Sequence, residues 1–483
     1  CAIDRVEEDA TRRLNDTISL SQVALKDSLG HLQARIDNAD LDKNLIVVTV
    51  FNPCPYPRTE VAEAHVDIPR ELGWKAFPLT DPAGAAIDFT SAATGHFGKV
   101  YRDKEDLALF SYADEHRLAF IAEDVPPLGY RTYVLRPGAA PRPRAKSLAA
   151  GRTMENAHLR VTVNADGTVD LVDRATKQVY RGLHYFEDRG ETGNAWAHKE
   201  PVKDVVVSTR GRRAKVTLTA NSDFMATFKV ETSLTVPENT EIPESTVDIA
   251  QYARRSRQTR RIPIEVHYTL RRDARTLDVR TVVDNTCRNH RLRLMCPTRI
   301  KTENSFAEMA YDVVERRINR DAKNPYSHIP YLTHPFVRFA GLYGAGRGFS
   351  FIGNGLHEYE ACDDRERTLA VTLIRAFDVR MCTTSVHVLE HRPSELSHCL
   401  GRNEFAYSLY PHGVAWEASG LLREADRVHA PFLVAQAGPG KGDLPKQQGF
   451  FEIKGRNVVF SCLKQAARSR DTRRVTSGRI ACG

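Results

Sequence analysis

The amino-acid sequence predicts a mainly β fold, in which a short N-terminal helical segment is followed by antiparallel β-sandwich domains. Runs of alternating or β-branched residues recur from residue 45 to residue 409. Turn residues, and not helical patterns, separate many of these long runs, which is typical of antiparallel sheets packed face to face. Helical spacing of apolar residues is clear in residues 2–37.

The N-terminal segment places apolar residues on one stripe and charged residues on the other face. The apolar positions recur at helical spacing: Ile3, Val6, Ala10, Leu14, Val23, Leu29, Leu32 and Ile36. Such a stripe needs partner helices to cover it, and the sequence supplies no obvious ones. We therefore expect residues 1–42 to be the remnant of a helical bundle. The first residue is Cys1 and not Met, which favours a fragment or processed chain.

From residue 43 the pattern changes to that of strands. Residues 45–51 are rich in β-branched side chains, and residues 61–68 and 130–135 alternate between apolar and polar. We expect a small β domain at residues 43–136. Residues 137–151 are rich in Pro, Ala, Gly and Arg, which is typical of a linker.

A larger β-sandwich domain is expected at residues 152–465. Asp166-Gly167 lies between two alternating runs, a strong hairpin signal, so the Asp166 carboxylate is assigned to turn chemistry. The glycine-rich residues 344–348 lack the Lys-Ser/Thr of a phosphate-binding loop and are interpreted as a hairpin loop. Residues 466–483 have only isolated apolar residues, so we expect a disordered or aberrant tail.

The composition is that of an ordinary globular protein. The 483 residues carry a net charge of +8, but 69 basic residues stand against 61 acidic ones along the chain, without a groove-reading or stacking motif, so nucleic acid is not an expected partner. A run of about 18 apolar residues is absent, so a membrane partner is not expected either. Nine cysteines without a C-x-x-C pair favour free, mostly buried thiols and a reducing compartment such as the cytoplasm.

Two motifs invite a chemical interpretation. Residues 387–391 match H-x-x-E-H, a zinc pattern that requires a helix, but the flanking residues favour strand or loop. Glu187, Asp188 and Glu191 precede Trp196 and His198. Carboxylates accept hydroxyl protons and an aromatic ring packs on the apolar face of a pyranose, so this cluster suits sugar recognition. The alternative is a solvated loop.

Six stretches occurring in family order resemble the C-terminal half of the family 38 α-mannosidases, with the bacterial branch, including mannosylglycerate-type hydrolases, closest. They are residues 50–60, 125–133, 155–180, 284–298, 355–375 and 405–412. The resemblance implies a galactose-mutarotase-like supersandwich fold. It also implies a retaining hydrolysis of terminal α-mannosides or mannose-containing oligosaccharides, with a carboxylate nucleophile, an acid/base carboxyl group and zinc.

The resemblance places all of these catalytic groups and zinc ligands on an N-terminal barrel domain that this sequence lacks. No catalytic or metal-ligating residue is therefore assigned here, and the chain alone is expected to be inactive. In the family, loops of the β domain return to the mouth of the barrel. The corresponding candidate substrate-binding residues are Asp188, Glu191, Asn194, Trp196 and His198. Asn194, Trp196 and His198 depart from the family's aspartate and tyrosines.

Two other functions stay open at this point. One is a standalone carbohydrate-binding or scaffolding β-sandwich protein without catalysis, using the same loops. The other is a basic interaction protein.

Overall fold

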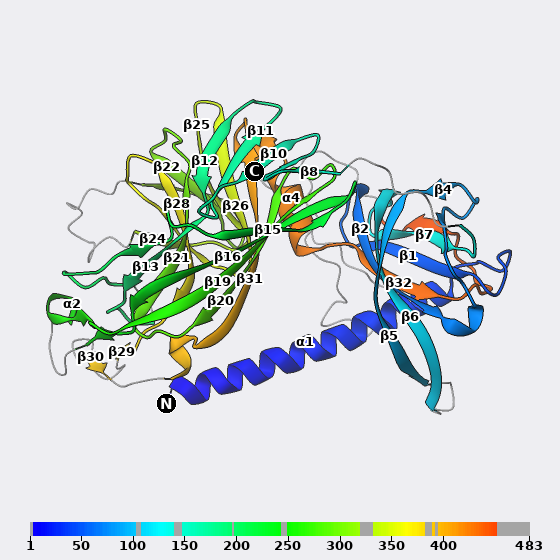
Figure 1. The fold of residues 1–483 in the computed structure, drawn as a ribbon, viewed down its shortest axis with the longest axis horizontal. Coiled ribbons are helices and arrows are strands. Elements are labelled where there is room, and N and C mark those ends of the chain that lie inside the picture. The colour runs from blue at the N-terminus through cyan, green and yellow to red at the C-terminus, as the bar shows by residue number, and fades with distance from the viewer. Residues whose placement is uncertain are drawn as a thin grey trace, which may run out of the picture. The chain divides into compact units, whose positions relative to one another are not determined.

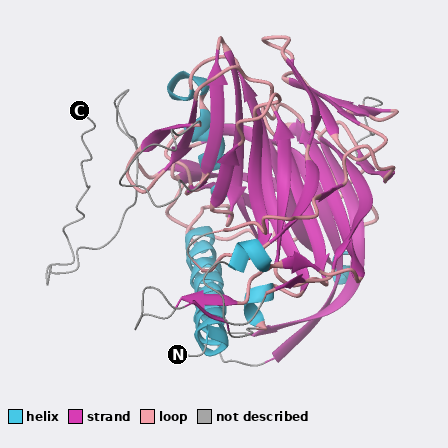
Figure 2. Cartoon of the chain, turned by 90° about the vertical axis from the view of Figure 1, so that its left-hand side faces the viewer, coloured by secondary structure: helices cyan, strands magenta, loops and turns pink. Residues whose placement is uncertain are grey.

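In a computed structural model of the chain, the structure describes residues 3–102, 108–139, 147–195, 198–242, 249–318, 332–381, 389–391 and 395–451. The chain divides into two compact units, one of Cys1–Gln22 with Arg144–His429 and one of Val23–Pro143 with Ala430–Gly483. Strands dominate the described residues (Figure 2). The predicted fold class, an N-terminal helix followed by antiparallel sheets, is confirmed.

Helix α1 (Ile3–Ala34) occupies the segment predicted to be helical (Figure 1). Asp4 in its first turn and His31 in its last turn match the preferences of the helix ends for negative and positive charge. Leu29 and Leu32 pack beside Phe51 and Tyr130. The preceding apolar positions Val6, Leu14 and Val23 are exposed, with Leu14 63% accessible to solvent. No helix in the described part of the chain is long and apolar enough to cross a membrane.

The described residues of the smaller unit form two sheets. The first has the order β32-β1-β7-β3-β4 with β33 also paired to β7, and the second the order β2-β6-β5. The 3-10 turn η1 (Arg70–Leu72) follows β2. The strands are β1 (Ile46–Asn52), β2 (Arg58–Pro69), β3 (Leu79–Thr80), β4 (Ala86–Ile87), β5 (Phe89–Arg102), β6 (Ala108–Val125), β7 (Gly129–Leu135), β32 (Leu433–Ala437) and β33 (Gln447–Gly449).

Strand β1 is buried along its whole length. Val48 and Val50 enter the core between the two sheets, while Phe51 packs with the end of α1. Because both faces of this strand are covered, its sequence is a continuous apolar run and not an alternating one.

The larger unit contains three main sheets: β12-β11-β10-β9-β8, β14-β13-β21-β28-β27-β24, and the nine-stranded β15-β16-β19-β20-β31-β26-β25-β22-β23. Their strands are β8 (Ala149–Ala150), β9 (Thr153–Glu155), β10 (Leu159–Val163), β11 (Val169–Asp173), β12 (Val179–Leu183), β13 (Tyr185–Gly190), β14 (Val207–Ser208), β15 (Lys215–Asn221), β16 (Met225–Pro237), β19 (Thr259–Arg271), β20 (Leu277–Asn285), β21 (His290–Pro297), β22 (Asn304–Glu308), β23 (Val313–Arg317), β24 (Thr333–Pro335), β25 (Phe339–Gly344), β26 (Arg347–Asn354), β27 (Glu358–Ala361), β28 (Thr368–Arg375) and β31 (Gly401–His412).

Short elements complete this unit. They are the paired strands β17 (Thr240–Glu241) and β18 (Arg254–Arg255), the paired strands β29 (Val379–Met381) and β30 (Leu389–His391), the helices α2 (Ile249–Tyr252), α3 (Trp416–Ser419) and α4 (Leu421–His429), and the 3-10 turn η2 (Leu396–His398).

One apolar core joins the three main sheets of the larger unit. Along β19, Ile264, Val266 and Tyr268 are buried, whereas Glu265 and His267 between them are half-buried and hydrogen-bonded to each other. This period of two reflects the alternation of side chains across a strand. It is the pattern from which the sequence predicts β structure here.

The hairpin predictions are confirmed. Residues 164–168 connect β10 to β11, and the Asp166 carboxylate accepts hydrogen bonds from the backbone N–H and hydroxyl of Thr168. Residues 345 and 346 connect β25 to β26, both with positive φ. His391 ends strand β30, so this part of the H-x-x-E-H motif is not helical, as expected, while His387 lies outside the described residues.

The domain boundaries differ from prediction at the C-terminal side. The sequence assigns residues 152–465 to the large domain, but β32 pairs with β1 and β33 pairs with β7 of the smaller unit. After α4 the chain returns to its first sheet. No local sequence pattern predicts this long-range strand pairing. Within the predicted linker, residues 149–150 form β8. Residues 466–483 lie outside the described residues.

Five cysteines fall in the described residues, and all are free thiols. Cys54, Cys287 and Cys296 are buried, Cys362 is half-buried and Cys399 is exposed. Burial raises the pKa of the Cys287 thiol to about 11 and that of Cys296 to about 12. These two thiols therefore stay protonated at neutral pH and behave as small apolar side chains.

Candidate functional site

The candidate residues from the sequence lie at and after strand β13, the second strand of the six-stranded sheet. Successive side chains of a strand point to opposite faces. Phe186 enters the main apolar core from this strand. Tyr185 instead packs with Met295 and Ala370 in a separate small cluster. The same alternation places Glu187 and Arg189 on the face of Tyr185, and Asp188 on the core side.

The face of Glu187 carries a network of ion pairs, which we call the charged face: Glu187, Arg189, Arg291, Arg293, Glu358 and Glu360. Arg293 bridges Glu187 at 2.7 Å and Glu360 at 2.6 Å. Arg189 bridges Glu187 at 2.8 Å and Glu200 at 2.9 Å. Antiparallel pairing sets the first of these contacts, because Glu187 lies directly opposite Arg293.

Arg291 is the most enclosed member of the charged face. Its side chain is 1% accessible to solvent, and its guanidinium donates to Glu358 at 3.1 Å and to the Thr372 hydroxyl at 2.9 Å. Burial, followed by repulsion from Arg293, lowers the pKa of Arg291 below its ordinary value. A buried guanidinium with carboxylate and hydroxyl partners is a rigid element of the sheet, because losing a partner would leave its charge uncompensated.

Glu191 anchors the loop that follows β13. Its Oε1 accepts from the backbone N–H of Gly193 at 2.6 Å and of Lys199 at 3.2 Å. Its Oε2 is bound by His198 Nδ1 at 2.6 Å and Arg375 Nε at 3.0 Å. Burial opposes the charge of Glu191, but the attraction of His198 and Arg375 and the bond from Gly193 outweigh it, so its pKa lies below the ordinary value.

His198 lies between two carboxylates. Its second nitrogen, Nε2, is 3.5 Å from Oε1 of Glu200. Burial opposes protonation of His198, but attraction to Glu191 and hydrogen bonds to Glu191 and Glu200 raise its pKa above the ordinary value. The bond from His198 and the nearby Arg189 lower the pKa of Glu200 to about 2. The three shifts therefore all favour the charged forms of these groups.

Asp188 lies on the core side and joins a separate buried network. Its two oxygens contact Arg255 Nη2 at 2.6 Å and His290 Nδ1 at 2.5 Å, and all three side chains are at most 1% accessible. His290 Nε2 is 3.0 Å from Oδ1 of Asn285. The network ties β13 and β21 to the short strand β18.

The core and the charged face of this sheet fall within residues 154–378, which match the model described as the glycosyl hydrolases family 38 C-terminal domain. Residues 154–378 of this chain are similar to that domain. The resemblance expected from the sequence is thereby confirmed.

Known proteins support this family. The chain is 27% identical over 364 residues, 73% of its length, to a protein of Halalkalibacterium halodurans named putative mannosylglycerate hydrolase. It shares its fold with an α-mannosidase of Enterococcus faecalis, with a TM-score of 0.84, 22% identity and 96% of this chain covered. A second family 38 structure from that organism gives a TM-score of 0.83 at 21% identity, again over 96% of this chain.

The chain spans only part of these proteins' lengths: 39% of the named relative, and 54% and 56% of the two solved chains.

The candidate site residues predicted from the sequence differ in their burial and in their bonding partners. Asp188 and Glu191 are buried, with their oxygens bonded inside the chain, so direct sugar contact by either stays a prediction. His198 and Glu191 are brought together as an ion pair. Asn194 is half-buried, and its backbone carbonyl accepts from Arg375. Trp196 lies outside the described residues.

Sequence reasoning missed the arginines that organise this region. Arg291 and Arg293 were noted only as part of a resembling stretch, and Arg375 only as the end of another. Arg291 and Arg293 are two residues apart on a strand, and this spacing predicts that their side chains share one face. The pairing of β13 with β21, which brings Glu187 to Arg293, has no local signal.

Three carboxylates of this region, Glu187, Glu191 and Glu200, do not have the properties of the general acid of a glycoside hydrolase. Glu187, Glu191 and Glu200 are held in ion pairs that favour their charged forms. A general acid for glycoside hydrolysis instead requires a raised pKa. No group of three or more His, Cys, Asp or Glu side chains among the described residues is arranged to hold a metal ion.

Proposed function

We propose that this chain is the C-terminal part of a retaining α-mannosidase-like glycoside hydrolase. It would take part in hydrolysis of terminal α-mannosides when joined to a zinc-bearing barrel domain. The observation that carries the proposal is the match of residues 154–378 to the family 38 C-terminal domain. The solved structure titled as an α-mannosidase, which shares the fold over 96% of this chain, supports it.

The surface of α1 supports a covering partner. Leu14, Ile18 and Leu25 are 63%, 52% and 42% accessible, and successive 3.6-residue turns place them on one side of the helix. Exposed apolar stripes of this kind mark interaction surfaces. The partner that we propose is the remainder of the full-length enzyme.

The proposal assigns the chemistry to that remainder. The described residues do not fit a zinc site, so the proposal assigns zinc to the barrel domain. The contribution of this chain is to hold the loop after β13, through the ion pairs of Glu191 with His198 and Arg375. A loop fixed in this way can position substrate hydroxyls with a smaller loss of loop entropy on binding.

The substrate that we propose is a terminal α-mannoside or a mannose-containing oligosaccharide. The name of the Halalkalibacterium halodurans relative points to mannosylglycerate as one member of this class. A bacterial cytoplasmic location stays a prediction, since the cysteine pattern favours a reducing compartment and the resemblance is to the bacterial branch of the family.

The test is to express the chain joined to the barrel encoded upstream of it, and to follow release of p-nitrophenol from p-nitrophenyl α-mannoside. Zinc-dependent turnover by the joined protein, with none by the 483-residue chain alone, is expected. NMR of the first-formed sugar should show the α anomer, as retention requires. Mannoside turnover by the chain alone would contradict the proposal, as would a joined protein that binds zinc and folds but does not cleave mannosides.

A further inference from the structure

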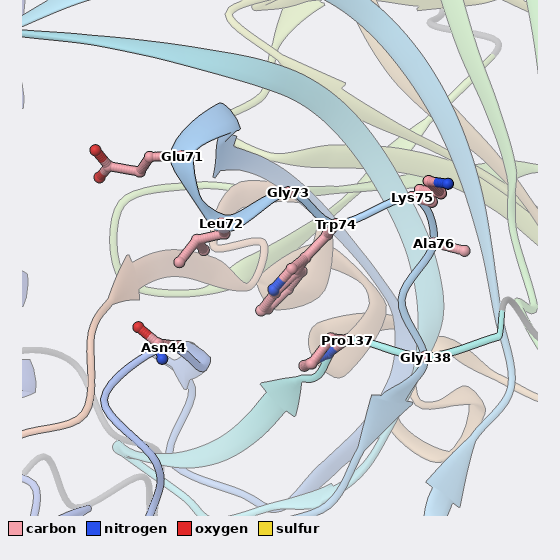
Figure 3. Close-up of a pocket in the computed structure, with 9 residues that line it drawn as sticks. All are labelled: Asn44, Glu71, Leu72, Gly73, Trp74, Lys75, Ala76, Pro137 and Gly138. Carbon is pink, nitrogen blue, oxygen red and sulfur yellow. The ribbon is translucent and has the colours of Figure 1, made fainter.

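The smaller unit contains a surface pocket of about 470 Å³, which we call the Trp74 pocket. It is lined by Asn44, Glu71, Leu72, Gly73, Trp74, Lys75, Ala76, Pro137 and Gly138 (Figure 3). Its volume falls within the range of ligand pockets in proteins. The lining comes from three connections of the same unit: the residues before β1, those around η1, and those after β7.

Local backbone contacts hold these connections in place. Gly73 adopts φ +64 at the end of η1, a left-handed conformation that turns the chain toward Trp74. The N–H of Gly138 donates to the Ala76 carbonyl at 3.2 Å, which joins the two walls. The backbone N–H of Asn44 donates to the Asp42 carboxylate at 2.8 Å, which orders the third connection.

The indole of Trp74 forms the centre of the pocket. Figure 3 shows it projecting into the space bounded by Leu72, Asn44 and Pro137, while the side chains of Glu71 and Lys75 extend away from it. Trp74 also packs against the core of this unit, so packing accounts for part of its contacts. Packing does not account for the open volume beside the ring.

We propose that the Trp74 pocket binds a pyranose ring of a saccharide. The apolar face of a pyranose packs on an indole, as aromatic side chains favour. The exposed Asn44 amide offers both a donor and an acceptor to the sugar hydroxyls. Leu72 and Pro137 flank the ring edges with apolar surface. The choice of mannose as the sugar rests on the proposed function, but binding here requires no catalytic partner.

The test uses the 483-residue chain labelled with 5-fluorotryptophan, whose three tryptophans give separate ¹⁹F signals. Trp74→Phe identifies the Trp74 signal. Methyl α-mannoside should shift that signal in a saturable way. Mannitol, which has hydroxyls but no ring face, should leave it unmoved. A Trp74 signal that mannoside does not shift, or that mannitol shifts equally, would overturn the proposal.

Asn44→Ala gives a second measurement that leaves the core untouched, because Asn44 is exposed. It should weaken mannoside binding about fivefold, the effect of losing one hydrogen bond. The matched control is Asn354→Ala, at an exposed asparagine of the larger unit that does not line the pocket, and it should leave binding unchanged. Equal affinity for Asn44→Ala and the parent chain would contradict the role of the amide.

The two proposals fail separately. A joined protein without mannosidase activity would end the proposed function while the Trp74 signal could still report sugar binding. An unshifted Trp74 signal in an active joined protein would end only the pocket proposal.

Discussion

Glu191 receives four hydrogen-bond donors on one carboxylate, two from the backbone and two from the side chains of His198 and Arg375. Buried ion pairs of this kind contribute little net stability compared with apolar packing, but removing one partner leaves an uncompensated charge. The role of this carboxylate is therefore to keep the loop after β13 in one conformation.

Glu191→Gln should lower the free energy of unfolding by about 3 kcal/mol. The amide N–H₂ would face groups that are themselves donors, and the buried charge of Arg375 would lose its carboxylate partner. Urea denaturation of the two proteins measures this difference. The control is Glu155→Gln, at a surface carboxylate paired with Arg160 and Arg174, where a loss below about 1 kcal/mol is expected. Equal losses at both positions would contradict the anchoring role of Glu191.

His198 makes this anchor depend on pH. The pKa of His198 is raised in the folded chain, whereas the pKa of a histidine in an unfolded chain is about 6.5. The folded state therefore holds its proton more tightly. The resulting stabilisation is complete below the unfolded pKa and is lost as pH rises through the folded pKa.

Unfolding measured at several pH values should show this loss on the alkaline side, and His198→Gln should remove it. NMR titration should place the His198 pKa above the ordinary value. His184, fully buried and hydrogen-bonded to Tyr268 and Tyr407, is the internal reference, because burial lowers its pKa to about 3. A His198 pKa at or below the unfolded value would refute the prediction.

At the scale of elements, the β10–β11 hairpin shows how a local signal and a distant contact act together. The Asp166-Gly167 turn is evident from the sequence, and Gly167 adopts φ +84. A Cβ at Gly167 would lie only 2.7 Å from Cγ1 of Val230 on β16. The glycine thus serves both the turn conformation and the close approach of another sheet.

Gly167→Ala should cost about 3 kcal/mol, from the left-handed conformation and from the clash with Val230. Gly151→Ala is the matched control, since Gly151 has φ +59 but open space around its Cβ position. Its loss should be about 1 kcal/mol, the conformational part alone. Thermal or urea unfolding of both variants checks the difference, and similar losses would mean that Val230 moves aside.

At the scale of the whole molecule, each of the two units is built from two separate segments of the chain. Strands β32 and β33 belong to the sheet of β1 and β7, although about 300 residues separate β7 from β32. The first sheet of the smaller unit is thus completed by strands that follow the whole larger unit in the sequence. Such non-local pairing is costly in loop entropy and slow to form.

A chain that ends at His429 should lose the cooperative unfolding of the smaller unit, because β1 would lose its neighbour β32 and expose a sheet edge. The larger unit, whose strands all precede residue 430, should still unfold cooperatively. Calorimetry of the full and shortened chains tests this. Two intact transitions in the shortened chain would show that β32 and β33 are dispensable.

Much of the fold follows from local patterns. The helix at residues 3–34, the strand at 46–52 and the hairpins at 164–168 and 345–346 were predicted because their periodicity and turn residues lie within short segments. The candidate site was predicted only in part. The carboxylates and His198 were identified from their composition, but their partners Arg255 and Arg375 lie far along the chain.

By itself, the sequence determined that this protein is a β-rich domain resembling family 38, with its turns and its one long N-terminal helix, because these depend on neighbouring residues. Other features became visible only in the tertiary structure. Glu191 pairs with Arg375, and the buried Asp188 pairs with Arg255 and His290. Strands β32 and β33, within residues 433–449, complete the first sheet. Pairing across long separations depends on which surfaces bury each other, and the local pattern of a strand is the same for many possible partners.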